Sequence, residues 1–219
     1  FNEEEFAYSN GGVIITWKDG MYGAVSEEGK KLVECKYNGL RCLPNEKGQF
    51  ALEIDEKVYC FDADGEVFFV VENLNSLNIN EGYVTYSYNV YSEECEKYLP
   101  CVAMYNIEDD KLYRVTEPSE GVAILVVTPV VDNKFYISNQ TNGMVSMIIE
   151  IDVETKERTR VVPGFGRRML APHDKYGTTI ESFWYDGVGI LNIEDNESYI
   201  VNHADLMTAY NGPWESYYY

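Results

Sequence analysis

Short apolar runs rich in Val, Ile, Tyr and Phe recur along the chain, and almost none of them repeats at the three- and four-residue spacing of an amphipathic helix. Runs of this length and composition are typical of β-strands. The clearest of them span residues 13–17, 50–54, 83–90, 122–128, 144–151 and 178–184. The pattern therefore predicts an all-β protein.

Turn signals separate these runs. Seven glycines directly follow Asn or Asp, a pairing that accepts the positive φ angles of tight hairpin turns. The pairs are Asn10-Gly11, Asp19-Gly20, Asn38-Gly39, Asp64-Gly65, Asn142-Gly143, Asp186-Gly187 and Asn211-Gly212. We expect antiparallel strands joined by short connections.

The turns are also periodic. One series of glycines precedes expected strands at Gly12, Gly48, Gly82, Gly121 and Gly177, with a mean interval of about 41 residues, close to the ~40–45 of four-stranded propeller blades. A second series, made of acidic turns, alternates with the glycines in a constant order, at residues 27–29, 63–65, 108–110, 153–155 and 194–196. Two series in constant order predict five repeated units within one domain.

We place the five units near residues 6–47, 48–81, 82–120, 121–176 and 177–219, each with three or four antiparallel strands. One such unit cannot bury both of its faces, so neighbouring units must stack. A five-bladed β-propeller meets this requirement and leaves only short sheet edges exposed. An open array of β-hairpins and a two-sheet sandwich are the alternatives.

Residues 17–33 and 37–40 resemble the bacterial WG β-repeat. Tyr22-Gly23 matches its aromatic-Gly pair, Glu28-Gly29 its acidic turn and Tyr37-Asn38 its closing corner; Tyr22 stands where Trp is usual, and Cys35-Lys36 where proline is usual. A fainter copy covers residues 57–67. The resemblance implies a repeat β-protein that serves as an interaction surface, often in the cell envelope, and it brings no catalytic residues.

Charge excludes several classes of partner. The 219 residues carry 17 basic and 37 acidic side chains, a formal charge of −20. A chain of this charge lacks the clustered cations that bind nucleic-acid phosphates, and anionic membrane surfaces repel it. The longest apolar run, residues 121–131, is shorter than the about 20 residues of a spanning helix. We expect a monomer without a transmembrane segment.

The chain begins at Phe1, and we expect that an upstream segment such as an export signal has been removed. This favours an extracellular or cell-envelope location, with the cytoplasm as the alternative. Five cysteines, an odd number without CxxC spacing, are interpreted as small buried hydrophobes. Cys95 and Cys101 form the best candidate pair for a disulfide.

One segment departs from the acidic background. Residues 156–175 hold six basic and two acidic side chains, a local charge of +4, and residues 163–174 lack strand character. We expect ligand contacts from this region, because paired guanidinium groups hold carboxylate or phosphate with several donors. The candidates are Arg160, Arg167, Arg168 and His173 within this segment and Trp184 after it. The alternative is a connector whose arginines pair with nearby acids.

Other chemistry is sparse. Asp62, Asp64 and Glu66 resemble half of a calcium loop, with an ordinary hairpin turn as the alternative, and no other cofactor is expected. His173-Asp174 resembles part of a catalytic triad, but no GxSxG elbow accompanies it. We therefore expect no catalytic residues.

The 19 tyrosines offer rigid contact area with a polar hydroxyl, which suits protein or sugar recognition. Tyr86 and Tyr88 lie on one face of their expected strand by the two-residue period, so we interpret them as structural. The leading hypothesis is a non-catalytic binding module that recognises a protein or glycan through loops on one face. The alternatives are a glycan-acting hydrolase with a central acidic channel and a structural segment of a larger protein.

Overall fold

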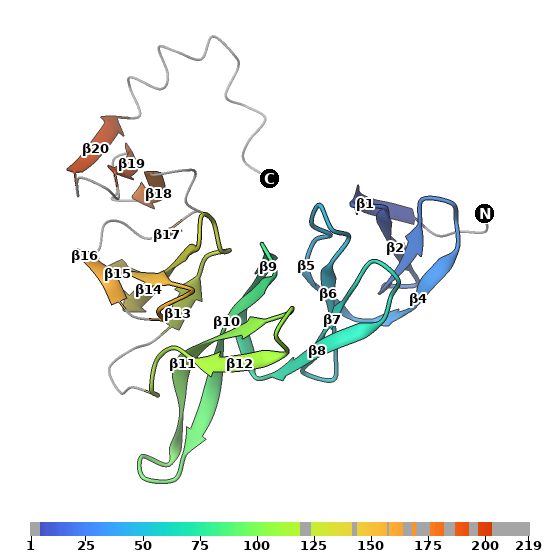
Figure 1. Cartoon of the computed structure of the whole chain (residues 1–219), viewed down its shortest axis with the longest axis horizontal. Coiled ribbons are helices and arrows are strands. Elements are labelled where there is room, and N and C mark those ends of the chain that lie inside the picture. Colours follow the sequence, from blue (N-terminus) through green and yellow to red (C-terminus); the bar gives the residue numbers. More distant parts are fainter. Residues whose placement is uncertain are drawn as a thin grey trace.

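The chain forms β-structure throughout its described residues. The computed structural model describes residues 5–118, 124–141, 144–156, 158–163, 168–169, 176–181, 187–192 and 197–202, with side chains in 8–118, 127–137 and 149–156. Across these ranges, twenty strands form five four-stranded antiparallel sheets, and no helix is present (Figure 1). The all-β antiparallel prediction is confirmed. The described residues contain no helix of the length and apolarity that crossing a membrane requires.

Each sheet is built from four consecutive strands in chain order. The first sheet contains β1 (Glu5–Asn10), β2 (Val13–Lys18), β3 (Met21–Ser26) and β4 (Lys31–Tyr37). The second contains β5 (Gly39–Cys42), β6 (Phe50–Ile54), β7 (Lys57–Phe61) and β8 (Val67–Glu72). The third contains β9 (Leu74–Asn80), β10 (Tyr83–Ser92), β11 (Lys97–Asn106) and β12 (Lys111–Arg114).

The last two sheets have the same layout. The fourth contains β13 (Ile124–Val127), β14 (Lys134–Thr141), β15 (Met144–Asp152) and β16 (Arg158–Pro163). The fifth contains β17 (Arg168–Met169), β18 (Tyr176–Glu181), β19 (Gly187–Asn192) and β20 (Glu197–Asn202). All six apolar runs expected as strands overlap observed strands, so those predictions are confirmed.

The two turn series occupy different places in the sheets. The acidic turns at residues 27–29, 63–65, 108–110 and 153–155 all lie between the third and fourth strands of their sheets, and residues 194–196 lie outside the described residues. Gly12, Gly48 and Gly82 precede second strands, but Gly121 precedes β13, the first strand of the fourth sheet. In the fourth sheet the turn between the first and second strands is Asp132-Asn133. Neither residue is glycine, yet their φ angles are 50° and 61°. Asp and Asn tolerate this region better than other residues, which explains how the turn forms without glycine.

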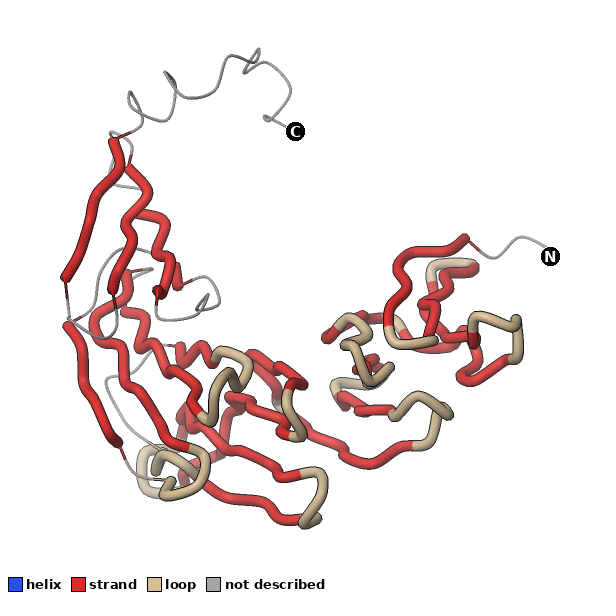
Figure 2. Tube along the Cα trace, turned by 45° about the horizontal axis from the view of Figure 1, so that its top comes forward, coloured by secondary structure: helices blue, strands red, loops and turns tan. Residues whose placement is uncertain are grey.

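The sheets follow one another along an arc, with the first and fifth at its two ends (Figures 1 and 2). Consecutive sheets contact each other in chain order: β4 meets β6, β5 meets β9, β9 meets β13 and β15 meets β17. An inner sheet is therefore covered on both faces by its neighbours.

The two-residue period of β6 shows how this covering is encoded. Phe50 and Leu52 are fully buried against the first sheet, in a cluster with Val13 and Ile15. Ala51, between them, is fully buried in a separate cluster with side chains of the third sheet. Alternate residues of one strand thus enter two different cores, because successive side chains point to opposite faces.

Polar side chains of β9 and β10 fix the third sheet against the fourth. The Asn78 side-chain amide donates to the Val127 carbonyl at 2.8 Å, and Asn80 donates to the Val130 carbonyl at 2.6 Å. The buried Thr85 hydroxyl donates to the Thr128 carbonyl at 2.7 Å. β13 is the edge strand of the fourth sheet, so no further strand pairs with it on its outer side. The three side-chain donors supply the hydrogen bonds that buried carbonyl groups need there.

Backbone contact fixes the first sheet against the second. Gly11, in the turn between β1 and β2, has a φ of +55°, and a Cβ placed there would lie 2.2 Å from the Gly48 nitrogen and 2.5 Å from the Asn45 carbonyl oxygen. Gly12 also has positive φ, but a Cβ there meets nothing within 4 Å. Only glycine fits at position 11, because the turn touches the β5–β6 loop with its main chain.

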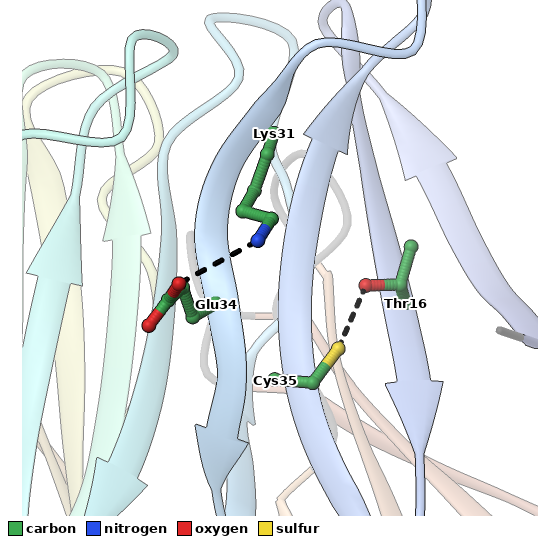
Figure 3. Close-up of polar contacts among 4 residues, drawn as sticks. All are labelled: Thr16, Lys31, Glu34 and Cys35. Atoms are coloured by element: carbon green, nitrogen blue, oxygen red, sulfur yellow. Dashed lines mark hydrogen bonds and ion pairs between the residues drawn. The ribbon is translucent and has the colours of Figure 1, made fainter.

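Glycine at position 23 serves a contact within the first sheet. The Thr16 hydroxyl on β2 and the Cys35 thiol on β4 lie 3.3 Å apart, across the intervening strand β3 (Figure 3). A Cβ on Gly23 of β3 would lie 2.8 Å from Cys35 Sγ. Glycine is thus required for this contact. Figure 3 also shows the nearby surface ion pair of Lys31 with Glu34 at 3.5 Å, a type that contributes little stability.

Candidate functional site

Most residues of the predicted ligand site lie outside the described residues. These are Arg167, His173 and Trp184. Arg160 lies on β16, and Arg168 lies on β17. The prediction that residues 163–174 lack strand character is wrong at β17, because Arg168 and Met169 pair with β18 and complete the four-stranded fifth sheet.

The candidate calcium loop is a hairpin turn between β7 and β8. Asp62 Oδ1 accepts hydrogen bonds from the backbone N–H groups of Asp64 at 3.0 Å and Glu66 at 2.9 Å. The carboxylate that would bind the cation instead caps its own turn. Among the described residues, no group of three or more His, Cys, Asp or Glu side chains is placed to hold a metal ion. These residues thus form the hairpin turn of the alternative interpretation.

Glu150 on β15 is the one buried carboxylate among the described side chains, with 5% of its surface exposed. It accepts a hydrogen bond from the Tyr136 hydroxyl at 2.9 Å and forms an ion pair with Lys134 at 3.3 Å. Arg160 is the residue directly opposite Glu150 in β16. The hydrogen bond from Tyr136 and the ion pair with Lys134 compensate the burial of Glu150, which explains the acid as structural.

Glycan hydrolysis requires two opposed carboxyl groups, one of them an acid with a raised pKa. The carboxyl group nearest in strand order to Glu150 is Asp152, and its pKa is lowered, chiefly because its oxygen accepts a backbone hydrogen bond from Thr155. A lowered pKa suits a turn-capping carboxylate and not a general acid. Asp152 therefore does not supply a raised-pKa acid beside Glu150.

The cysteines are free. Cys60 and Cys101 are buried, whereas Cys35, Cys42 and Cys95 are partly exposed, so the buried-hydrophobe interpretation holds for two of the five. Burial raises the pKa of the Cys60 and Cys101 thiols. Raised values disfavour the thiolate, the form that reacts as a nucleophile.

The most prominent feature of the described surface is the hairpin of β10 and β11. The two strands pair from Tyr83 with Asn106 to Ser92 with Lys97, whereas the register of β9 ends opposite Tyr88 and that of β12 ends opposite Ala103. Residues 90–99, named here the projecting hairpin, therefore extend beyond both neighbouring strands (Figure 1). The pairing keeps this extension ordered.

Tyr91 and Tyr98 are direct cross-strand partners on the projecting hairpin. They are 52% and 59% exposed, and their rings meet edge to face with centroids 5.3 Å apart. On the opposite face Leu99 is only 7% exposed. One face of the hairpin thus contacts the protein, and the other presents an aromatic pair to solvent.

The aromatic pair continues a face that the molecule uses for its own assembly. By the two-residue period, Tyr91 shares its face of β10 with Thr85, and Tyr98 shares its face of β11 with Met104. Thr85 bonds the fourth sheet, and Met104 lies in the core between the third and fourth sheets. The face is covered near the centre of the strands and uncovered at their end.

The tip of the projecting hairpin is acidic. Glu93, Glu94 and Glu96 are all exposed, and Lys97 is the one base of the turn. The Cys95 N–H donates to the Ser92 hydroxyl at 3.4 Å, which closes the turn. Within the described part of the chain, no hydrogen bond or ion pair engages the side chains of these three glutamates. Three charges therefore lie beside two exposed rings.

The base of the projecting hairpin is anchored. The prediction that Tyr86 and Tyr88 share a face is confirmed, with ring centroids 5.2 Å apart and Tyr86 buried. The side-chain amides of Asn75 on β9 and Asn89 on β10 exchange two hydrogen bonds of 3.0 Å each. These contacts hold the root of the hairpin on both faces.

The sequence contained a signal for the aromatic pair that our prediction did not use. Tyr91 and Tyr98 stand at equal distances from the centre of the polar run 93–96, which makes them cross-strand neighbours if that run is a tight turn. The turn itself is short, because β11 begins at Lys97.

No protein-family model matches the chain, and no curated protein matches its sequence. Solved structures are similar in fold. A structure described as a complex of KlAtg21 with the coiled-coil of AgAtg16 has a TM-score of 0.61 and 13% identity, covering 87% of this chain and 66% of that one. A crystal structure of the mitotic checkpoint complex has a TM-score of 0.55 and 7% identity, covering 93% and 66%. At these identities the likeness concerns the fold alone.

Proposed function

We propose that this protein is a non-catalytic binding module that recognises a protein or glycan through loops on one face of its array of β-sheets. The observation that carries the proposal is the exposed pair of Tyr91 and Tyr98 on an ordered hairpin that extends past its neighbours. Tyrosine supplies large contact area at low entropic cost, and paired strands reduce the ordering that binding requires.

We further propose that this array is a β-propeller of bacterial WG-repeat type, exported or held in the cell envelope. Five consecutive four-stranded sheets that bury both faces of the inner units support this arrangement.

The basic segment around Arg167 and Arg168 is proposed as a second contact surface, with Arg160, His173 and Trp184 beside it in sequence. Its test is the double variant Arg167→Glu/Arg168→Glu. If every ligand bound by the native chain is retained, this surface plays no part in binding.

Retention on two immobilised panels, one of random peptides and one of glycans, tests the function itself. We expect the native chain to bind members of at least one panel and the double variant Tyr91→Ala/Tyr98→Ala to lose most of that binding. Tyr8→Ala is the matched control, because Tyr8 lies on the first sheet and is 42% exposed. Equal binding by the double variant, or no retention of the native chain on either panel, overturns the proposal.

A further inference from the structure

The projecting hairpin joins two surfaces of different chemistry. One face of the hairpin carries the exposed rings of Tyr91 and Tyr98. The tip carries the three exposed glutamates, whose carboxylates have no protein partner in the described part of the chain. A partner that covers both must offer apolar groups to the rings and positive charge to the tip. Arg and Lys provide both, since their stems are apolar and their charged groups are attracted to aromatic faces.

The whole chain favours the same kind of partner. Its charge of −20 repels acidic ligands at long range and accelerates the approach of basic ones. A neutral glycan can use the carboxylates only as hydrogen-bond acceptors, whereas a basic segment also gains charge attraction to all three of them. The charge distribution therefore favours a basic protein segment over a sugar.

The covered part of the same face shows how a protein element is held there. Next to Thr85 and Met104 the face receives the fourth sheet through apolar contact and a hydrogen bond of 2.7 Å. Tyr91 and Tyr98 continue this face toward the tip of the hairpin, where both rings are exposed. An added element would thus extend an interface that the fold already builds.

We propose that the exposed face of the projecting hairpin docks a basic segment of another protein. Its apolar atoms cover Tyr91 and Tyr98, and its Arg or Lys side chains face Glu93, Glu94 and Glu96. This inference rests on the proposed binding function and specifies its partner class.

The experiment uses the labelled full chain on an immobilised array of random linear peptides, with Kd then measured for the tightest binders. We expect the bound peptides to be enriched in Arg and Lys together with aliphatic or aromatic residues. Tyr91→Ala/Tyr98→Ala weakens these peptides about tenfold or more, as truncation of central aromatic contacts does. Both rings are more than half exposed, so the variant is expected to fold, which circular dichroism checks.

A second pair of variants separates the hairpin charge from the charge of the whole chain. Neutralising Glu93, Glu94 and Glu96 to Gln weakens binding about threefold or more at low salt, with a smaller effect at high salt. The matched control changes three exposed glutamates in turns of the first two sheets: Glu27→Gln, Glu56→Gln and Glu66→Gln. It alters the net charge equally, and we expect it to retain the affinity.

Three results overturn the inference. They are bound peptides without basic enrichment, equal losses in the two triple variants, and unchanged binding by the tyrosine variant. Tyrosine-dependent binding to glycans alone refutes the basic partner and leaves the proposed function standing. Failure of the native chain on both panels refutes both.

Discussion

The contact between Gly11 and the β5–β6 loop makes a sharp prediction about the joint between the first two sheets. A Cβ at position 11 would lie 2.2 Å from the Gly48 nitrogen, 2.5 Å from the Asn45 oxygen and 2.8 Å from the Glu46 oxygen. All three atoms are backbone, so no side-chain rotation relieves the clash. Gly11→Ala must either separate the two sheets or distort the turn.

The expected cost has two parts. Holding a non-glycine residue in the left-handed region costs about 1–2 kcal/mol, and forcing an extra methyl into a tightly packed site costs about 1–3 kcal/mol. Together they predict a loss of about 2–5 kcal/mol, a large share of the ~5–15 kcal/mol of a typical protein. Gly12→Ala incurs only the first part, because its Cβ meets nothing within 4 Å.

Urea unfolding followed by tryptophan fluorescence measures both variants against the native chain. We expect the two alanine variants to differ by about 1–3 kcal/mol in the free energy of unfolding, the steric part alone. A Cβ on Gly48 would lie 2.5 Å from the Gly11 carbonyl oxygen. Gly48→Ala is therefore expected to lower the free energy of unfolding about as much as Gly11→Ala does. Equal stabilities for the variants at positions 11 and 12 would refute the close contact between the sheets.

Three further predictions concern stability elsewhere. Gly23→Ala is expected to cost about 1–3 kcal/mol, and Cys35→Ala should not restore the loss in urea unfolding, because the added Cβ also meets the Cys35 nitrogen and the Val33 oxygen at 2.8 Å. Tyr136→Phe removes a donor from the buried Glu150 carboxylate and is expected to cost about 1.5–3 kcal/mol by the same measurement; an unchanged midpoint would show that the bond is dispensable. The pKa of Tyr105 is raised to about 12 by burial and by its hydrogen bond to Asp110. The folded state thus favours the neutral phenol. The contribution of Tyr105 to the free energy of unfolding is therefore complete below the ordinary pKa of about 10 and is lost as pH rises through about 12. Urea midpoints should fall over this interval, and less steeply in Tyr105→Phe; parallel curves would contradict the assignment.

The all-β antiparallel fold was predictable because its strands are short apolar runs separated by turn residues. Phe50, Ala51 and Leu52, for example, are consecutive apolar residues, which is typical of a strand covered on both faces. The acidic turns marked the third connection of each of the first four sheets. The first connection of the fourth sheet escaped prediction, because Asp132 and Asn133 adopt positive φ angles without glycine while Gly121 stands near an expected strand.

The candidate site was less predictable for a physical reason. Tyr86 and Tyr91 are the same residue type on one strand, yet Tyr86 is 3% exposed and Tyr91 is 52% exposed. Their difference depends on the length of the hairpin and on where neighbouring sheets end. Residues distant in sequence set these boundaries, so local pattern does not reveal them.

Amide hydrogen exchange of the full chain, with and without the tightest-binding basic peptide, tests the central claim most directly. The account predicts slower exchange at residues 90–99 on binding, with unchanged exchange in the first sheet. Protection elsewhere, with residues 90–99 unaffected, would contradict the assignment of the projecting hairpin as the binding surface.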